Sequence, residues 1–492
     1  MKTINTTVIL VSCLIFSMIG CSGDDPVTEE KPIKDNPVEN AQKIVLKAED
    51  YKHQFIGGGV SIGLFLGHHY SMNATAQDEA IRLIAKDCNM KYFQDYIEIY
   101  PVDNPDYFDR RADYVKAAKV YRPELEFSLV GNKFPVDLMY DITVGSETLK
   151  ALNTDDPEIY NKLANWWFQL FKGFQERGVS TEILNVVNEP DLDRTFRKYH
   201  YGLNGDTKEA VSRVFKFAVP KFKAMLADPL INTLNMKVPL IMGPSTISPN
   251  GCLEYMAYFK TNHPDVWQEI DIIATHQYEN GANPQLFKNI VNQAEGKAFY
   301  QSETHALKGD ALNLDAVFAS RDLKAALSLS NLFSTAVNNG VSAWFYFQNN
   351  YPNEEIYPGG LLSIPWAADK PTPYKHYYAF RELTSAQPAS SHVIGFDIES
   401  DADSQIIAFR KKDENTVYAH YSNYSAKAKD ISITVKDASN GILKITGYSS
   451  ISTDAINNGT PIESKNFPSP EDTVMLTTEA LSVSTIKITL NN

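Results

Sequence analysis

Two glutamates, each placed soon after a short apolar run, are the residues of this sequence best suited to catalysis. Glu189 follows the mostly apolar run 183–187 and Asn188, and Pro190 comes next. Glu303 follows the apolar run 298–300 and the polar pair Gln301-Ser302. A carboxyl group at the end of an apolar strand loses part of its hydration, which raises its pKa toward the range of a general acid. Around Glu189, a strand followed by an ordinary solvated turn would leave the same pattern. The surrounding elements must therefore decide between the two interpretations.

From about residue 43 to 388, short apolar strands alternate with amphipathic helices. Strands are predicted at 55–61, 90–99, 125–130, 182–188, 238–243, 270–275, 298–300 and 341–347. Helices are predicted at 75–87, 105–120, 156–177, 207–226, 250–262, 284–295, 313–338 and 373–384. Strands that alternate with helices are typical of βα units. Eight such units predict an α/β fold, a (β/α)8 TIM barrel.

After residue 389 the helical pattern ends. Short strands, separated by Asn, Asp, Gly and Ser, are predicted at 393–396, 405–409, 416–421, 431–435, 442–448 and 483–490. Strands of this length with turn residues between them are typical of a sandwich. Residues 389–492 are therefore predicted to form a C-terminal antiparallel β-sandwich domain.

The C-terminal ends of barrel strands carry the reactive groups of such folds. Glu189 ends the fourth predicted strand and Glu303 the seventh, so both are expected on one face of the barrel. His276 and Tyr278 follow the sixth strand, and Trp344 lies on the eighth. A carboxyl pair of this kind suits glycoside hydrolysis. One carboxylic acid protonates the leaving oxygen and the other attacks the anomeric carbon.

These motifs resemble those of clan A glycoside hydrolases, which are retaining enzymes with (β/α)8 barrels. The shared motifs are Asn-Glu-Pro on strand four, His-x-Tyr on strand six, a glutamate on strand seven and a tryptophan on strand eight. The resemblance implies that Glu189 is the acid/base and Glu303 the nucleophile. It also implies that Asn188 hydrogen-bonds the 2-hydroxyl of the sugar, that Tyr278 orients Glu303, and that Trp344 stacks under the same sugar.

Within the clan, family 30 is the most similar. Its opening strand, closing helix and last sandwich strand resemble segments 54–59, 374–380 and 481–486. The resemblance also implies that a segment before the barrel, 44–46, joins the sandwich. The sequence departs from the family after strand three, where Val-Gly-Asn-Lys-Phe-Pro at 130–135 replaces the usual Trp-Ser-Pro-Pro.

Four histidines near the predicted strand ends are further candidates. His276 and His305, the latter two residues past Glu303, are predicted to bind substrate. His68 and His69 follow strand one and could face the same cleft, or could be loop residues with no part in catalysis. No Cys/His cluster has metal-ligand spacing. We therefore expect no metal and no organic cofactor.

The first residues have the features of an export signal. Residues 1–20 contain an apolar run, 8–16, that is too short for a membrane span and is typical of a signal peptide. Met-Ile-Gly-Cys resembles a bacterial lipobox, so Cys21 is predicted to carry a lipid anchor. The acidic residues 24–25 resemble the surface-export signal of outer-membrane lipoproteins. Residues 21–42 are predicted to be a flexible tether. The alternative is a plain secreted protein with a chance cysteine.

The net charge of −14 argues against nucleic acid as a partner, because phosphate binding needs a basic surface. We expect a monomeric lipoprotein of the outer membrane or cell surface that hydrolyses a β-linked polysaccharide with retention of configuration, by endo action. Two alternatives stay open. One is a non-catalytic surface glycan-binding protein on a barrel scaffold, and the other is a transglycosylase, which would use the same residues.

Overall fold

The computed structural model of the chain describes residues 40–63, 65–97, 104–144, 146–192, 199–200, 207–306, 321–352, 359–399 and 401–491. The chain divides into two units, Met1–Glu39 and Asn40–Asn492, and all described residues belong to the second. The predicted signal peptide, Cys21 and the tether up to residue 39 lie outside the described residues. Within the ranges given, no helix is both long enough and apolar enough to cross a membrane.

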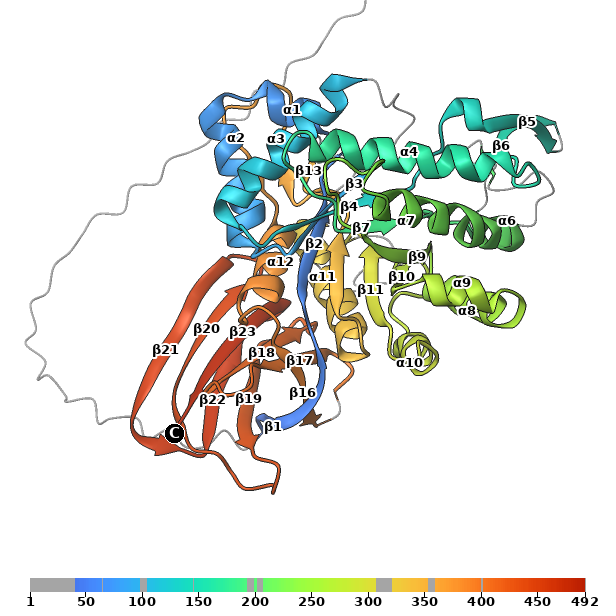
Figure 1. Cartoon of the computed structure of the whole chain (residues 1–492). Helices are drawn as coiled ribbons and strands as arrows, with labels where there is room; N and C mark the ends of the chain where they lie inside the picture. The colour runs from blue at the N-terminus through green and yellow to red at the C-terminus, as the bar shows by residue number, and fades with distance from the viewer. Residues whose placement is uncertain are drawn as a thin grey trace, which may run out of the picture. The chain divides into compact units, whose positions relative to one another are not determined.

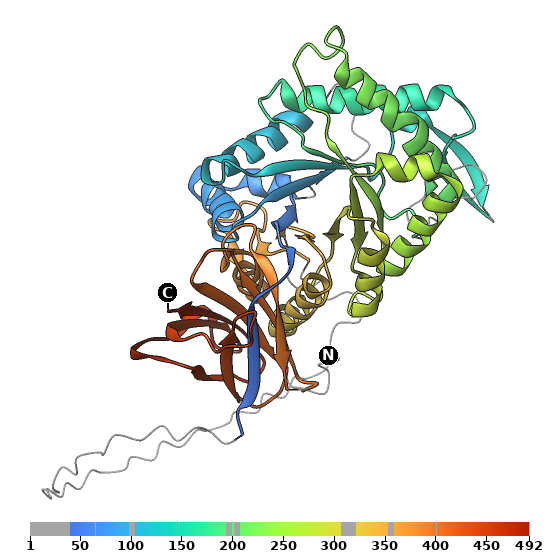
Figure 2. The ribbon, with the colours of Figure 1, turned by 60° about the horizontal axis from the view of Figure 1, so that its bottom comes forward.

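Eight parallel strands close into a barrel, as predicted (Figure 2). In chain order the strands are β2 (Gly57–Ser61), β3 (Tyr92–Tyr96), β4 (Glu126–Val130), β7 (Ile183–Asn185), β9 (Leu240–Thr246), β10 (Ile272–His276), β11 (Ala298–Glu303) and β12 (Ala343–Tyr346). Pairing of β12 with β2 closes the ring. Each strand coincides with one of the eight predicted segments, so the (β/α)8 barrel is confirmed.

Helices surround the barrel strands (Figure 2). They are α1 (Leu66–Ser71), α2 (Ala74–Ile81) with the π-helical turn η1 (Arg82–Asp87), α3 (Pro105–Tyr121), α4 (Glu158–Gln175), α6 (Thr207–Arg213), η3 (Val214–Ala218), α7 (Val219–Ala227), α8 (Pro249–Asn262), α9 (Pro264–Glu269), α10 (Pro284–Gln293), α11 (Arg321–Asn338) and α12 (Lys375–Ser385). Side chains cap several of these helices. Asn73, for example, accepts a hydrogen bond from the backbone of Ala76 at the start of α2.

The barrel strands face two separate apolar layers. Side chains from alternate positions fill the barrel interior, where Tyr92, Tyr300 and Phe345 pack together. The intervening side chains pack against the surrounding helices. Because successive side chains on a strand point to opposite faces, each strand divides its residues between the two layers. On β12, Phe345 therefore points into the barrel and Trp344 points toward the surrounding helices.

A nine-stranded, mostly antiparallel sheet forms the C-terminal part, in the order β21-β20-β23-β18-β17-β16-β1-β19-β22. Its strands are β1 (Gln42–Gln54), β16 (His392–Ile398), β17 (Ser404–Arg410), β18 (Thr416–Asn423), β19 (Lys429–Lys436), β20 (Ile445–Thr453), β21 (Asn458–Glu471), β22 (Thr473–Thr478) and β23 (Ser482–Leu490). The blue strand β1 lies among the orange and red strands (Figure 1). Ile44 is opposite Ile398 on one side and Ile433 on the other. The implied pairing of segment 44–46 with the sandwich is confirmed.

Some strands lack the apolar alternation from which the others were predicted. The hairpin of β5 (Met139–Val144) and β6 (Glu147–Leu152) extends the loop after β4. The edge strand β21 is almost entirely exposed and contains Pro461, Pro468 and Pro470. Polar side chains and prolines are common on edge strands, where they prevent pairing with other chains. Such a strand resembles a loop at the level of sequence.

Candidate active site

Glu189 and Glu303 lie at the same end of the barrel. Glu189 follows β7 and is 2% exposed, while Glu303 is the last residue of β11 and is 4% exposed. The backbone N–H of Glu189 donates to the carbonyl of Ser245 at 2.8 Å. Glu189 has a φ of 44°, in the left-handed region. Two strands that are separated along the chain thus bring two buried carboxyl groups to one place.

His276, at the end of β10, lies between the two carboxyl groups. Its Nδ1 is 3.1 Å from Oε1 of Glu189, and its Nε2 is 3.7 Å from Oε2 of Glu303. Three polar atoms lie within 4.8 Å of one another: one oxygen of Glu189, one nitrogen of His276 and one oxygen of Glu303. The imidazole is 1% exposed. His276 is therefore in contact with both glutamates.

Two tyrosines contact the two oxygens of Glu303. The hydroxyl of Tyr278 donates to Oε1 at 2.7 Å, and the hydroxyl of Tyr96, at the end of β3, donates to Oε2. The Tyr278 contact was implied by the resemblance. Tyr96 was not predicted, although it is in phase with Tyr92, which points into the barrel. All five residues of β3 are buried, so the sequence alone does not indicate which alternate set faces the barrel interior, and no local signal identified Tyr96.

The buried site changes the acidity of its groups. Burial raises the pKa of the Glu303 carboxyl, and the charge of Glu189 raises it further. His276 and the two tyrosine hydroxyls lower this pKa, but they do not cancel the increase. Burial lowers the pKa of His276, but the charge of Glu303 and the bond to Glu189 outweigh this effect, so that pKa lies above its ordinary value. Burial keeps the pKa values of Tyr96 and Tyr278 far above 10, so both hydroxyls stay protonated and can donate.

Two carboxylates and an imidazole are also a possible ligand set for a divalent cation. Both oxygens of Glu303 already accept hydrogen bonds from tyrosine hydroxyls. A cation would compete with these donors for the same oxygens.

The remaining predicted residues take different positions. Asn188 is buried, and its side-chain amide donates to Oδ1 of Asn132 at 3.3 Å. His305 is buried with its ring 5.5 Å from that of Tyr278. His69 packs against Tyr114 in the core, where burial lowers its pKa to about 4. Asn188 and His305 are thus close to the glutamates or their partners, and His69 has a structural position.

Comparison with solved structures shows the same architecture. A family 30 endoxylanase from Clostridium papyrosolvens C71 matches with a TM-score of 0.68 at 14% identity, covering 91% of this chain and 100% of the other. An endo-β-1,6-glucanase matches with a TM-score of 0.61 at 14% identity, covering 90% and 94%. The chain has the family 30 fold of clan A glycoside hydrolases. A conserved exported protein from Bacteroides fragilis shares it, with a TM-score of 0.68 at 13% identity and coverage of 90% and 99%. No family model and no curated protein matches the sequence.

Within this family 30 fold, Trp344 does not reach the site, contrary to the prediction. The indole is fully buried, points away from the barrel interior, and packs against Phe333 of α11 and Phe380 of α12. Its Nε1 donates to the side chain of Gln277 at 3.0 Å. The strand alternation explains the error, because Trp344 is out of phase with the inward-facing Phe345.

Replacing Trp344 is therefore expected to affect stability. We expect Trp344→Ala to lower the free energy of unfolding by about 3–5 kcal/mol, because a large buried side chain leaves a cavity. Chemical denaturation would measure this loss, and Trp344→Phe, which keeps most of the volume, should lose less. A folded variant with normal stability and a raised KM would contradict the structural role.

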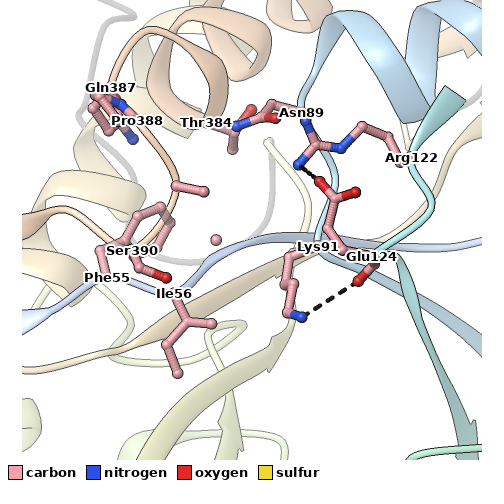
Figure 3. A pocket seen from close by; sticks show the side chains of 12 residues that line it. Phe55, Ile56, Asn89, Lys91, Arg122, Glu124, Thr384, Gln387, Pro388 and Ser390 are labelled. Carbon is pink, nitrogen blue, oxygen red and sulfur yellow. Dashed lines mark hydrogen bonds and ion pairs between the residues drawn. The ribbon is translucent and has the colours of Figure 1, made fainter.

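A second feature of the barrel is a pocket lined by residues at the starts of its strands (Figure 3). Its lining includes Gly57, which begins β2, and Lys91, which precedes β3. Two cationic side chains that line the pocket, Lys91 and Arg122, both interact with Glu124. Arg122 forms an ion pair with Glu124 at 2.5 Å, and Lys91 donates to the carbonyl of Glu124. A (β/α)8 barrel carries its reactive groups at the opposite, C-terminal strand ends, so this pocket is assigned no part in catalysis.

Proposed function

We propose that the chain is a retaining glycoside hydrolase that acts on a β-linked polysaccharide by endo action. The observation that carries the proposal is the pair of buried carboxyl groups, Glu189 and Glu303, with oxygens within 4.8 Å of each other. Retaining enzymes hold their carboxyl groups about 5–5.5 Å apart, whereas inverting enzymes leave room for a water between them at about 6.5–9.5 Å. The short separation supports direct attack by a carboxylate.

In the first step, the carboxylic acid of Glu189 donates its proton to the glycosidic oxygen while an oxygen of Glu303 attacks the anomeric carbon. The bond to the leaving sugar breaks, and a covalent glycosyl-enzyme forms. In the second step, Glu189, now ionised, takes a proton from the water that attacks the same carbon. The new C–O bond to water forms as the bond between the anomeric carbon and Glu303 breaks, so the sugar is released, Glu303 is again a carboxylate and Glu189 is again protonated.

The position of His276 suits this sequence of charges. The negative charge is on Glu303 before the first step and on Glu189 after it. Because His276 contacts both groups, an imidazolium would remain next to one carboxylate at each stage. The raised pKa of His276 supports this protonated form. We assign His276 to charge stabilisation within the pair, in addition to its predicted contact with substrate.

Phe347, the residue after β12, is proposed to take the stacking position that was expected for Trp344. It is in phase with the inward-facing Phe345, and its ring lies 5.6 Å from the ring of Tyr96 and nearly perpendicular to it. Its backbone N–H donates to Thr304, next to Glu303, at 2.7 Å. A half-buried aromatic ring beside the nucleophile can support the sugar that is being attacked.

A panel of polysaccharides tests the proposal. Xylan and β-1,6-glucan are the first candidates, because similar folds occur in an endoxylanase and an endo-β-1,6-glucanase. Proton NMR of the first products should show the configuration of the substrate, and short oligomers should precede free sugar. An inverted product would contradict the proposed nucleophile. Transfer to a sugar acceptor instead of water would indicate the transglycosylase alternative, and activity lost with EDTA and restored by a cation would indicate a metal enzyme.

We also propose that the protein is anchored at the outer membrane by a lipid on Cys21. The support is the lipobox-like Met-Ile-Gly-Cys at the end of the signal-like segment 1–20. A Cys21→Ser protein should leave the membrane fraction. Continued membrane association of that protein would contradict the anchor.

The hydrogen bond from Tyr96 should affect the dependence of activity on pH. Glu303 must be ionised to attack, so activity is lost as the pH falls through its pKa. The Tyr96 hydroxyl lowers that pKa. In Tyr96→Phe, the acid limb of kcat/KM should therefore move to higher pH. At neutral pH kcat/KM should fall about tenfold to a hundredfold, since a hydrogen bond to a charged group contributes about 1.5–3 kcal/mol.

Tyr92→Phe is the matched control for this experiment. Tyr92 lies on the same face of β3, but its hydroxyl interacts with that of Tyr300 at 3.1 Å and not with Glu303. Its pH profile should match the wild type. An unchanged profile in Tyr96→Phe would contradict the role given to the Tyr96 hydroxyl.

A further inference from the structure

Trp366 differs from the other four tryptophans of the chain. Those four, Trp166, Trp167, Trp267 and Trp344, are between 0% and 7% exposed, whereas Trp366 is 68% exposed. A single exposed apolar side chain is common on protein surfaces, so the exposure of Trp366 becomes informative only together with its place in the fold and its contacts.

The indole lies at the same end of the barrel as the glutamates. Trp366 is in the segment between β14 (Leu362–Ser363) and β15 (Thr372–Pro373), which follows β12, the eighth barrel strand. It packs on α1, which follows β2, the first barrel strand. In the closed barrel β12 lies between β2 and β11, the strand that ends in Glu303. Trp366 is thus on loops next to the strand of the proposed nucleophile.

Several contacts hold the indole in place while most of it stays exposed. The backbone N–H of Ala367 donates to Oγ of Ser71 at 2.7 Å, which ties the Trp366 segment to α1. A side chain added at Gly67 would come within 3.7 Å of the indole, so the ring lies close against this glycine. The ring of His68 is 5.5 Å away and nearly perpendicular, at 85°. The platform formed by Trp366, with His68 along one edge, is therefore preorganised.

A sugar ring is the ligand that fits this platform. One face of a pyranose carries C–H groups, which are attracted to the negative face of an aromatic ring and displace water from it. The perpendicular imidazole of His68 would lie beside the edge of such a sugar, within reach of its hydroxyls. Trp366 contacts Gly67 and His68 of α1, whereas Glu303 accepts hydrogen bonds from Tyr96 at the end of β3 and from Tyr278 after β10. The indole and the partners of Glu303 are thus carried by different segments.

We propose that Trp366, with His68, forms a remote subsite that stacks a sugar residue of the polysaccharide away from the cleaved bond. This inference rests on the proposed glycosidase function. The contribution of Trp366 to substrate binding should therefore depend on the length of the substrate. A long chain can reach both Glu303 and Trp366, whereas the shortest cleavable oligosaccharide spans only the reacting centre.

The test compares Trp366→Ala with the wild type on a length series. The probes are xylan, β-1,6-glucan and their oligosaccharides. On the polymer that the wild type cleaves, KM of the variant should rise about threefold to tenfold, the size of effect expected from the loss of one aromatic contact. On the shortest oligosaccharide that the wild type cleaves, KM and kcat should stay unchanged. Phe217→Ala is the matched control, because Phe217 is an exposed aromatic on η3, in the helix layer.

Binding gives a second readout that does not need turnover. In Glu303→Gln protein, a long oligosaccharide of the cleaved polymer should protect Trp366 from quenching by acrylamide, and the shortest one should not. The subsite would be overturned by any of three results. These are an equal rise of KM at every chain length, no rise of KM at any length, and acrylamide quenching that does not change when long oligosaccharides are added. A wild type inactive on every polymer would overturn the proposed function itself, and the subsite with it.

Discussion

Glu303→Gln is expected to abolish hydrolysis, with kcat lower by a factor on the order of 10⁶, the scale of loss when an enzyme loses its nucleophile. The amide keeps the shape of the side chain and can still accept a hydrogen bond from Tyr278, but it cannot form the glycosyl-enzyme. Reducing-sugar release from the polymer identified in the panel would measure the loss, and denaturation would show that the protein is folded.

Azide separates a lost nucleophile from a damaged site. In Glu303→Gly, azide can occupy the space of the carboxylate and attack the anomeric carbon once, so the glycosyl azide should have inverted configuration. Two results would contradict the assignment of Glu303 as nucleophile. One is activity of Glu303→Gln close to that of the wild type, and the other is a glycosyl azide with retained configuration from Glu303→Gly.

Glu189→Gln is expected to lower kcat on the polysaccharide by about 10²–10⁴, the usual contribution of general acid–base catalysis. The loss should depend on the leaving group. A dinitrophenol leaves without protonation, so the covalent intermediate should still form quickly from a dinitrophenyl glycoside and then hydrolyse slowly. Stopped-flow measurements should show a burst of dinitrophenol equal to the enzyme concentration.

Glu182→Gln is the matched control for Glu189→Gln. Glu182 precedes β7, whereas Glu189 follows it, so the two lie at opposite ends of the barrel. Burial raises the pKa of Glu182, and its carboxylate accepts a hydrogen bond from the backbone of Phe127, which an amide can also accept. Glu182→Gln should keep wild-type kcat. Equal losses from dinitrophenyl glycoside and polymer in Glu189→Gln would contradict its role as acid/base.

The error at Trp344 and the omission of Tyr96 have the same physical origin. Alternation along a strand separates its residues into two sets, but both sets are apolar in a barrel that is buried on its two faces. The sequence around β12 therefore did not indicate whether Trp344 or Phe347 points inward. Only closure of the barrel and the register with β11 and β2 decided this.

The sequence by itself determined the eight barrel strands, the alternation with helices and the strand ends that carry Glu189 and Glu303, because these follow from local periodicity and from chain order. It also identified Tyr278 through a local motif. The tertiary structure alone placed His276 between the carboxyl groups, directed Tyr96 and Phe347 inward, and held Trp366 exposed against α1. These features depend on contacts between residues far apart in the chain. Such contacts arise from barrel closure and side-chain packing, which local patterns do not encode.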